Sequence, residues 1–203
     1  LLPAGTRIAL EHGGAAPVIL DASADIDALV PKLAKGGFYH SGQVCVSVQR
    51  VFIMGDQTAE IASKLGDYSN NLVVGNAIYE KTDCGPLIRN KEVDRVDNWV
   101  AEARKGGAKL ISGGSKISNS CYAPTVLLDP PKESEVSKSE LFGPVICLYE
   151  SESLSEAISR CNSLPFAFQA SIFSNNYSKI IEFFNSVDAS AVMINDHTAF
   201  RVD

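Results

Sequence analysis

No apolar run in this sequence approaches the roughly 18 residues that a membrane-spanning helix needs. Positive charge is also scarce, because 18 Lys and Arg face 24 Asp and Glu and leave a formal net charge of −6. The basic residues are scattered along the chain and form no stripe, which argues against a nucleic-acid surface. We therefore expect neither a membrane nor a nucleic acid as a partner.

Cysteine pairs, metal-ligand spacings and glycine fingerprints are missing as well. The five cysteines are odd in number and widely spaced, and no CxxC pair occurs. A disulfide framework or zinc ribbon is therefore not expected, and a reducing, cytoplasmic location fits better. The three histidines lack metal-binding spacing, and no GxGxxG dinucleotide fingerprint occurs.

The first residues lack the basic and apolar regions of a signal peptide. Since the sequence begins almost directly in a predicted strand and stops after an apolar run, we expect both ends to be cut from a longer chain.

The chain has the composition and length of one globular domain, with 203 residues, 45% apolar and 21% charged. Strands are predicted at 6–10, 17–20, 48–54, 109–111, 125–128, 145–149, 169–173 and 191–194, and helices at about 25–38, 58–69, 90–105, 153–161 and 177–184. Strands that alternate with helices in this way are typical of a parallel sheet. We predict an α/β fold with a mostly parallel open sheet and helices on both faces.

One turn, Gly42-Gln43-Val44-Cys45, joins the end of a predicted helix to a β-branched strand. Loops on a rigid scaffold often carry chemistry, and a thiol here could reach a cleft. A free cysteine is by default a small buried hydrophobe, and the other four cysteines fit that description. Cys45 differs because Gly42 allows close backbone approach, and a turn can offer main-chain N–H groups to an oxyanion. From the residues alone, Cys45 is either a nucleophile or an inert thiol.

Two acidic positions are further candidates. Glu11 ends a predicted apolar strand beside two glycines, where partial desolvation would raise its pKa toward that of a general base. Glu140 is followed closely by Phe142 and Gly-Pro, so the pair could hold ribose hydroxyls and pack against a flat ring. A solvated strand end and an ordinary loop are the respective alternatives.

His40 lies five residues before Cys45, so a Cys–His dyad must be considered. No third group that would orient the imidazole is in view. A surface or packing histidine is the alternative.

These motifs occur together, in order, in one known pattern. The segments are Leu10-Glu11-His12-Gly13-Gly14, then Gly42-Gln43-Val44-Cys45, then Glu140-Leu141-Phe142-Gly143-Pro144-Val145. The set resembles the aldehyde dehydrogenase superfamily. Three intervening stretches are similar to that family too: Cys84-Gly85-Pro86-Leu87-Ile88, Ala123-Pro124-Thr125-Val126-Leu127 and Ala191-Val192-Met193-Ile194-Asn195. The resemblance covers the whole chain.

The resemblance implies a mechanism. Cys45 would attack the aldehyde as a thiolate, and hydride transfer to NAD or NADP would leave a thioester. Glu11, as the general base, would activate the water that hydrolyses the thioester, which favours the hydrolytic branch over relatives that transfer the acyl group to coenzyme A. Glu140 would hold the nicotinamide ribose, and Phe142 would pack near the nicotinamide.

The resemblance also implies a missing part. Family members are longer and carry an N-terminal cofactor domain and an oligomerisation hairpin. Residues 1–203 would then be the catalytic, nucleophile-bearing domain alone, with little dehydrogenase activity by itself, and the full-length parent would be a homo-oligomer. The tail is similar to a bacterial subgroup that acts on small, sometimes phosphorylated or phosphonylated aldehydes. There His197 or Arg201 could meet an anionic substrate, and a surface salt bridge is the alternative.

Two other functions stay open at this point. Cys45 could serve a cofactor-independent cysteine esterase or hydrolase that depends on His40. The chain could also be an interaction domain that retains the fold without the activity.

Overall fold

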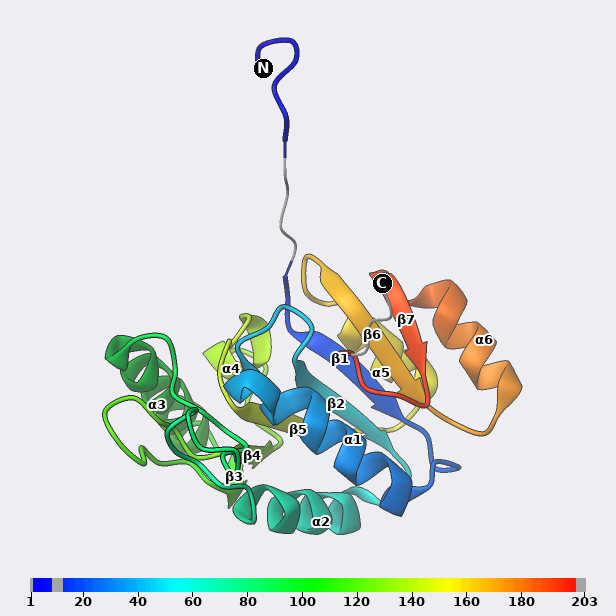
Figure 1. Ribbon diagram of the computed structural model, residues 1–203. Helices are drawn as coiled ribbons and strands as arrows, with labels where there is room; N and C mark the ends of the chain where they lie inside the picture. The colour runs from blue at the N-terminus through cyan, green and yellow to red at the C-terminus, as the bar shows by residue number, and fades with distance from the viewer. Residues whose placement is uncertain (1, 9–12, 200–203) are drawn as a thin grey trace.

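The computed structural model describes residues 2–8 and 13–199, and these form one open sheet covered by helices (Figure 1). Its strands are β1 (Ala16–Leu20), β2 (Val48–Met54), β3 (Lys109–Ser112), β4 (Thr125–Leu128), β5 (Val145–Ser151), β6 (Ala167–Phe173) and β7 (Ala189–Ile194). They lie in the order β3-β4-β5-β2-β1-β6-β7. Among the described strands, β3 pairs antiparallel with β4, and the other pairs are parallel. The predicted α/β class with a mostly parallel sheet is confirmed.

Helices cover both faces of the sheet, as predicted. They are α1 (Ile26–Phe38), α2 (Thr58–Asn70), α3 (Asn90–Lys105), α4 (Glu135–Lys138), α5 (Leu154–Cys161) and α6 (Tyr177–Ser186). Successive side chains of a strand point to opposite faces. Accordingly, Val51 and Ile53 pack in the cluster with α1 and α2, whereas Phe52 packs in the cluster with α3, α4, α5 and α6. Each face of the sheet thus has its own apolar core.

The helix ends follow from local capping chemistry. The carboxylate of Asp25 accepts hydrogen bonds from the first turn of α1. The hydroxyl of Ser153 accepts from the Glu156 N–H at 3.2 Å, as the capping pattern predicts. Helix α3 ends at Gly106-Gly107, where Gly107 has a φ of +116° that favours glycine.

The structure differs from the sequence-based expectations at two places. The predicted strand at 6–10 is wrong for residues 6–8, and the rest of it lies outside the described residues. Figure 1 shows the initial segment leaving the body of the domain, where no strand lies beside it to pair with. The short helix α4 was not predicted, because one turn gives no detectable hydrophobic periodicity.

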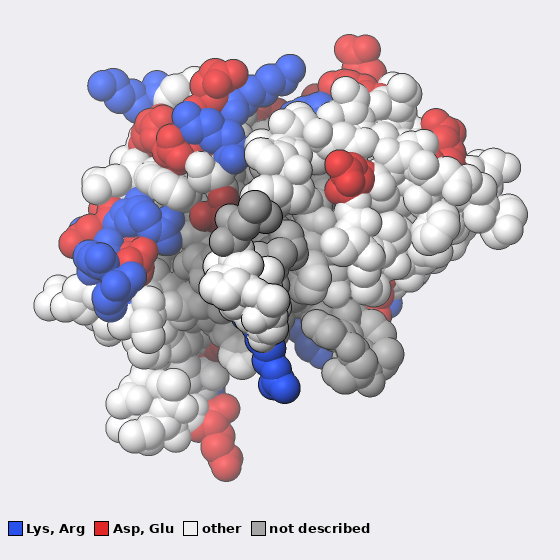
Figure 2. All heavy atoms as spheres, turned by 90° about the horizontal axis from the view of Figure 1, so that it is seen from above, with Lys and Arg blue, Asp and Glu red and all other residues white. Residues whose placement is uncertain are grey.

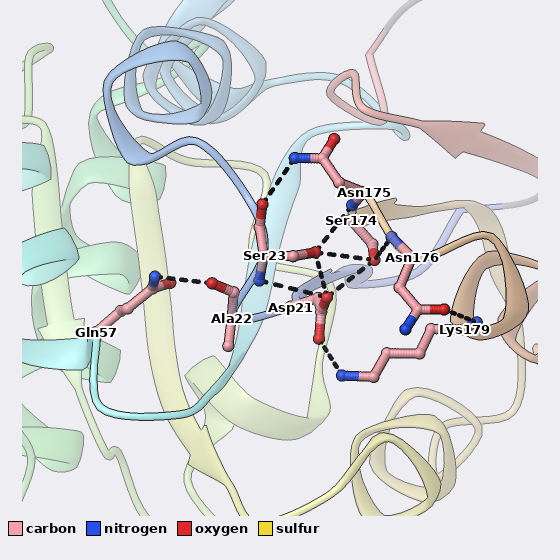
Figure 3. Close-up of polar contacts among 8 residues, drawn as sticks. All are labelled: Asp21, Ala22, Ser23, Gln57, Ser174, Asn175, Asn176 and Lys179. Carbon is pink, nitrogen blue, oxygen red and sulfur yellow. Dashed lines mark hydrogen bonds and ion pairs between the residues drawn. The ribbon is translucent and has the colours of Figure 1, made fainter.

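The carboxyl ends of β1 and β6 are tied together by a buried carboxylate (Figure 3). Asp21, which directly follows β1 and is 1% exposed, accepts hydrogen bonds from the hydroxyls of Ser23 and Ser174 at 2.5 and 2.9 Å. Its other oxygen forms an ion pair with Lys179 of α6. Burial alone would raise the pKa of Asp21, but these hydrogen bonds lower it to about 2. Ligands of open α/β sheets usually bind at the carboxyl ends. Here, that end of β1 and β6 is occupied by a satisfied polar network.

Candidate active site

The sequence-predicted site residues that the structure describes meet at the opposite, amino edge of the sheet. Residues 13–15 lead into β1, the Cys45 turn leads into β2, and residues 139–144 lead into β5. These strands are parallel neighbours in the order β5-β2-β1, so the three entering segments are adjacent. Figure 2 looks onto this edge of the sheet. An amino-edge site therefore brings together segments far apart in the sequence.

Cys45 occupies a tight turn between a 3-10 helix, Tyr39–Gly42, and β2. The Ser47 N–H donates to the Val44 carbonyl at 3.0 Å, which makes Cys45 the second residue of the turn. Cys45 is half-buried, whereas the other four cysteines are buried. Of the described residues, none accepts a hydrogen bond from the Cys45 N–H. This turn thus holds a half-buried thiol beside a backbone donor that no described residue uses.

Gly42 allows the Cys45 turn to touch the turn that follows Glu140. Its φ is +70°, and a side chain added here would collide with the carbonyl group of Gly143. A residue with a Cβ would have to move one of the two backbones. The close approach expected from Gly42 is therefore present, and its partner is the Glu140–Gly143 turn.

Glu140 folds back onto the segment that enters β1. Its Oε1 accepts a hydrogen bond from the Gly14 N–H at 3.1 Å, and a side chain at Gly13 would collide with the same carboxylate. Burial raises the pKa of Glu140, and the Gly14 hydrogen bond opposes that rise. No described residue donates to its Oε2. Phe142 is 41% exposed with a φ of +48°, a strained value for an aromatic residue.

Glu11, His12 and Arg201 lie outside the described residues. The Glu11 and Arg201 assignments therefore stay predictions. The described neighbours of Glu11, Gly13 and Gly14, are the residues that contact Glu140.

Two cavities flank the Cys45 turn. One, of about 700 Å³, is lined by Phe142, Gln43, His40 and the loop between 77 and 88. Gln43 ties that loop to the turn, because its Oε1 accepts from the Ile88 N–H at 2.8 Å and its Nε2 donates to the His40 carbonyl at 3.2 Å. Cys45 is not among the residues that line this cavity.

The other cavity, of about 530 Å³, is lined by Tyr39, His197, Lys32 and Lys35 among others. Burial, and secondarily the Cys45 thiol, raise the pKa of Tyr39, which places its ring near the turn. His197 is 7% exposed and therefore not a surface residue. Burial lowers its pKa, and its Nδ1 accepts from the Ala199 N–H at 3.1 Å. His197 thus faces a cavity lined by two lysines, Lys32 and Lys35, and by two carboxylates, Asp83 and Asp196.

A comparison with known proteins fits this geometry. The family model described as the aldehyde dehydrogenase family matches residues 3–203. The chain belongs to the aldehyde dehydrogenase family. It is similar to 3-sulfolactaldehyde dehydrogenase from Priestia aryabhattai, with 34% identity over 97% of this chain and 41% of that protein. The chain thus spans about two fifths of the length of the curated relatives that it matches.

Solved aldehyde dehydrogenase structures share the fold. Aldehyde dehydrogenase 21 from Physcomitrella patens, in complex with the reaction product succinate, matches with a TM-score of 0.90 and 34% identity, over 94% of this chain and 40% of that one. Glyceraldehyde-3-phosphate dehydrogenase from Methanocaldococcus jannaschii, complexed with NADP, matches with a TM-score of 0.89 and 32% identity, over 94% and 41%. Homologues in this family therefore bind nicotinamide cofactors.

His40 has a geometry that lends no support to a Cys–His dyad in this chain. It is exposed with a φ of +49°, and its ring packs beside that of Tyr39 with centroids 4.7 Å apart. Within the described part of the chain, no hydrogen bond joins it to Cys45. The packing alternative describes His40 better.

The described residues offer neither a metal-binding cluster nor a membrane-spanning helix. Across residues 2–8 and 13–199, no group of three or more His, Cys, Asp and Glu residues could hold a metal ion. Over the same residues, no helix has the length and apolarity to cross a bilayer.

Several residues that shape this candidate site were not predicted from the sequence. They include Gln43, described above, and Thr198, whose hydroxyl donates to the Val46 carbonyl at 2.8 Å. Gln49 and Arg95 bind the two peptide groups that flank Leu141. The Leu141 N–H donates to Oε1 of Gln49, and the Leu141 carbonyl accepts from Nη2 of Arg95. For Gln49, the available signal was a glutamine inside the apolar strand that follows Cys45, since a polar residue there needs buried partners.

Proposed function

We propose that this chain is the catalytic, nucleophile-bearing domain of an NAD(P)-dependent aldehyde dehydrogenase that oxidises an aldehyde to a carboxylic acid. The observation that supports this proposal most directly is the close backbone approach at Gly42, where the Cys45 turn meets the Glu140–Gly143 turn. The fold and family membership support the same reaction class. Because the chain spans about two fifths of its relatives, the activity is proposed for the full-length protein.

Cys45 carries the covalent steps. Its thiolate attacks the aldehyde carbon, and the resulting oxyanion of the thiohemiacetal is held by the N–H of Cys45, for which the described residues provide no acceptor. Loss of a hydride from the same carbon converts the thiohemiacetal into a thioester. Glu11 removes a proton from water, which attacks the thioester and releases the acid and the Cys45 thiolate.

The cofactor would be held by Glu140 and Phe142. When bound, the nicotinamide supplies the acceptor for the hydride. The residues fit this group, because Oε2 of Glu140 has no described donor and could accept from a ribose hydroxyl. The 41% exposed ring of Phe142 could pack against a flat heterocycle.

A small anionic aldehyde is the substrate class that we favour. Two of the relatives are named for 3-sulfolactaldehyde and glyceraldehyde-3-phosphate, both of which carry a negative group, whereas others are named for the neutral lactaldehyde and retinaldehyde. Lys32 and Lys35 line the cavity that His197 faces. Asp83 and Asp196 line the same cavity, and Lys32 Nζ lies 4.0 Å from the Asp196 carboxylate, so these lysines are not free of counter-charge. The preference for an anion over a neutral aldehyde therefore depends on Arg201, whose place is still a prediction, and on the names of these two relatives.

The test uses the full-length protein with NAD or NADP and a panel of sulfonated, phosphorylated and neutral aldehydes. We expect reduction of the cofactor, loss of that activity in Cys45→Ala, and retained activity in the control Cys161→Ala, which changes a buried thiol at the end of α5. Full activity of Cys45→Ala would show that Cys45 is not the nucleophile. Cofactor-independent cleavage of an activated ester that is lost in His40→Ala would favour the cysteine hydrolase instead.

A further inference from the structure

Gln49 is a buried polar residue on the strand that begins just after Cys45. It is the second residue of β2 and is 4% exposed. A buried primary amide is costly unless its donor and acceptor groups find partners. Its partners therefore indicate what the residue does.

All the partners of the Gln49 amide lie in the segment around Glu140. Nε2 donates to the carbonyls of Val136 and Ser139 at 3.0 and 2.8 Å. Oε1 accepts from the Leu141 N–H at 3.0 Å. One side chain thus binds the backbone on both sides of Glu140.

Leu141 is held from its other side as well. Its carbonyl accepts from Nη2 of Arg95 in α3 at 2.7 Å, and its side chain is 1% exposed. Arg95 is itself fixed, since its Nε donates to Glu92 at 2.8 Å and its guanidinium lies over the Trp99 ring, 4.5 Å from the centroid. The peptide groups that flank Leu141 are therefore clamped in one orientation.

The clamp accounts for the strained backbone of the next residue. Phe142 adopts a φ of +48°, which an aromatic residue does not favour, so the surrounding structure must impose it. With Leu141 buried and bound on both sides, Glu140 and Phe142 are held at the amino edge of the sheet. Strained residues of this kind cluster at ligand clamps and active sites.

We infer that Gln49 is a positioning residue: its amide holds Glu140 and Phe142 where they receive the nicotinamide cofactor. This inference rests on the proposed function, because it needs those two residues to contact the cofactor. It also links the two halves of the reaction. The same strand carries the nucleophile turn at its start and the clamp on the cofactor side at its second residue.

The test compares Gln49→Met with Gln169→Met in the full-length protein. Gln169 is a matched control, because it is a 4% exposed glutamine in β6 of the same sheet and its buried Oε1 has no hydrogen-bond partner among the described residues. We expect Gln49→Met to raise the calorimetric Kd and the KM for NAD or NADP by roughly tenfold to a hundredfold. The Kd and KM of Gln169→Met should stay at the wild-type values.

A second readout separates positioning from general damage. Alkylation of Cys45 by iodoacetamide without cofactor should proceed at the wild-type rate in Gln49→Met, because the thiol and its turn are untouched. If Gln49→Met does not fold, Arg95→Gln must show the same rise in cofactor Kd, since it removes the bond to the Leu141 carbonyl.

The outcomes distinguish the two proposals. Wild-type protein that neither binds nor reduces NAD or NADP would refute the proposed function and this inference with it. Active wild-type protein together with an unchanged cofactor Kd in Gln49→Met would overturn the inference alone. An equal loss of cofactor affinity in Gln169→Met would also overturn it, because the effect would then come from the sheet as a whole.

Discussion

The hydroxyl of Thr198 donates a hydrogen bond to the carbonyl oxygen of Val46, 2.8 Å away, although 152 residues separate them in the sequence. Val46 follows the nucleophile candidate directly, so this bond ties the segment after β7 to the Cys45 turn. Thr198 is fully buried, and His197 beside it packs against Gly36 of α1. The segment after the last strand therefore returns over the α1 face to the amino edge of the sheet.

Thr198→Val tests this link. Valine has nearly the same shape but leaves the Val46 carbonyl without a partner, so we expect the protein to lose about 1–2 kcal/mol of unfolding free energy. Thr58→Val is the control, because the buried Thr58 hydroxyl has no hydrogen-bond partner among the described residues, and its removal should change stability little. Urea unfolding of both variants measures the difference. Equal effects of the two substitutions would show that the Val46 bond contributes nothing.

Asp21→Asn tests the polar network at the carboxyl edge. The pKa of Asp21 is lowered to about 2 from an ordinary value of 3.8, so its charge stabilises the folded state at pH values above about 4. That contribution, about 2 kcal/mol, is lost as the pH falls from about 4 to about 2. We expect wild type to exceed Asp21→Asn in stability at pH 7 and the gap to narrow by pH 3. Urea unfolding at pH 7, 5 and 3 measures it, and a gap that is independent of pH would contradict the assignment.

A matched control for that experiment is Asp56→Asn. Asp56 is exposed in the turn after β2, and its carboxylate makes no hydrogen bond or ion pair with any described residue. Its removal should leave the pH dependence of stability unchanged. A similar narrowing in this variant would assign the effect to net charge rather than to Asp21.

Thiol labelling tests the accessibility of Cys45. We expect one of the five cysteines to react quickly with a thiol reagent in the native protein, since Cys45 alone among them is half-buried. Burial raises the pKa of the thiols of Cys84, Cys147 and Cys161 to about 12 and keeps them protonated. Cys45→Ser should abolish the fast phase, and denaturant should expose all thiols of the wild type. A fast phase that persists in Cys45→Ser would show that another cysteine is the reactive one.

Much of the fold and of the Cys45 turn could be predicted, because both depend on local signals. The alternation of strands and helices identified the sheet, and Gly42 marked a close backbone approach before Cys45. The partner in that approach, Gly143, could not be predicted from residue spacing, since contacts between distant segments depend on the order of strands. The order β5-β2-β1 brings these turns together.

Buried polar partners were harder to predict for a different reason. Gln49 lies in a strand that reads as an apolar run, and a hydrophobic pattern does not show which backbone groups a buried amide will bind. The strand expected at residues 6–8 failed for a related reason. An alternating pattern predicts a strand only where a neighbouring strand is present, and Ile8 remains 64% exposed in the structure.

Gly42→Ala tests the backbone contact on which the proposed active site depends. An alanine at Gly42 would face both an unfavourable φ of +70° and a collision with the Gly143 carbonyl. Gly107→Ala separates these two effects, because Gly107 has a φ of +116° but nothing within 4 Å of an added Cβ. We expect Gly107→Ala to cost about 1–2 kcal/mol from backbone strain alone. Gly42→Ala should cost clearly more and should also slow alkylation of Cys45, since the turn must move away from Gly143. Equal melting temperatures for the two variants, with an unchanged alkylation rate, would mean that the Cys45 turn does not depend on its contact with the Glu140–Gly143 turn.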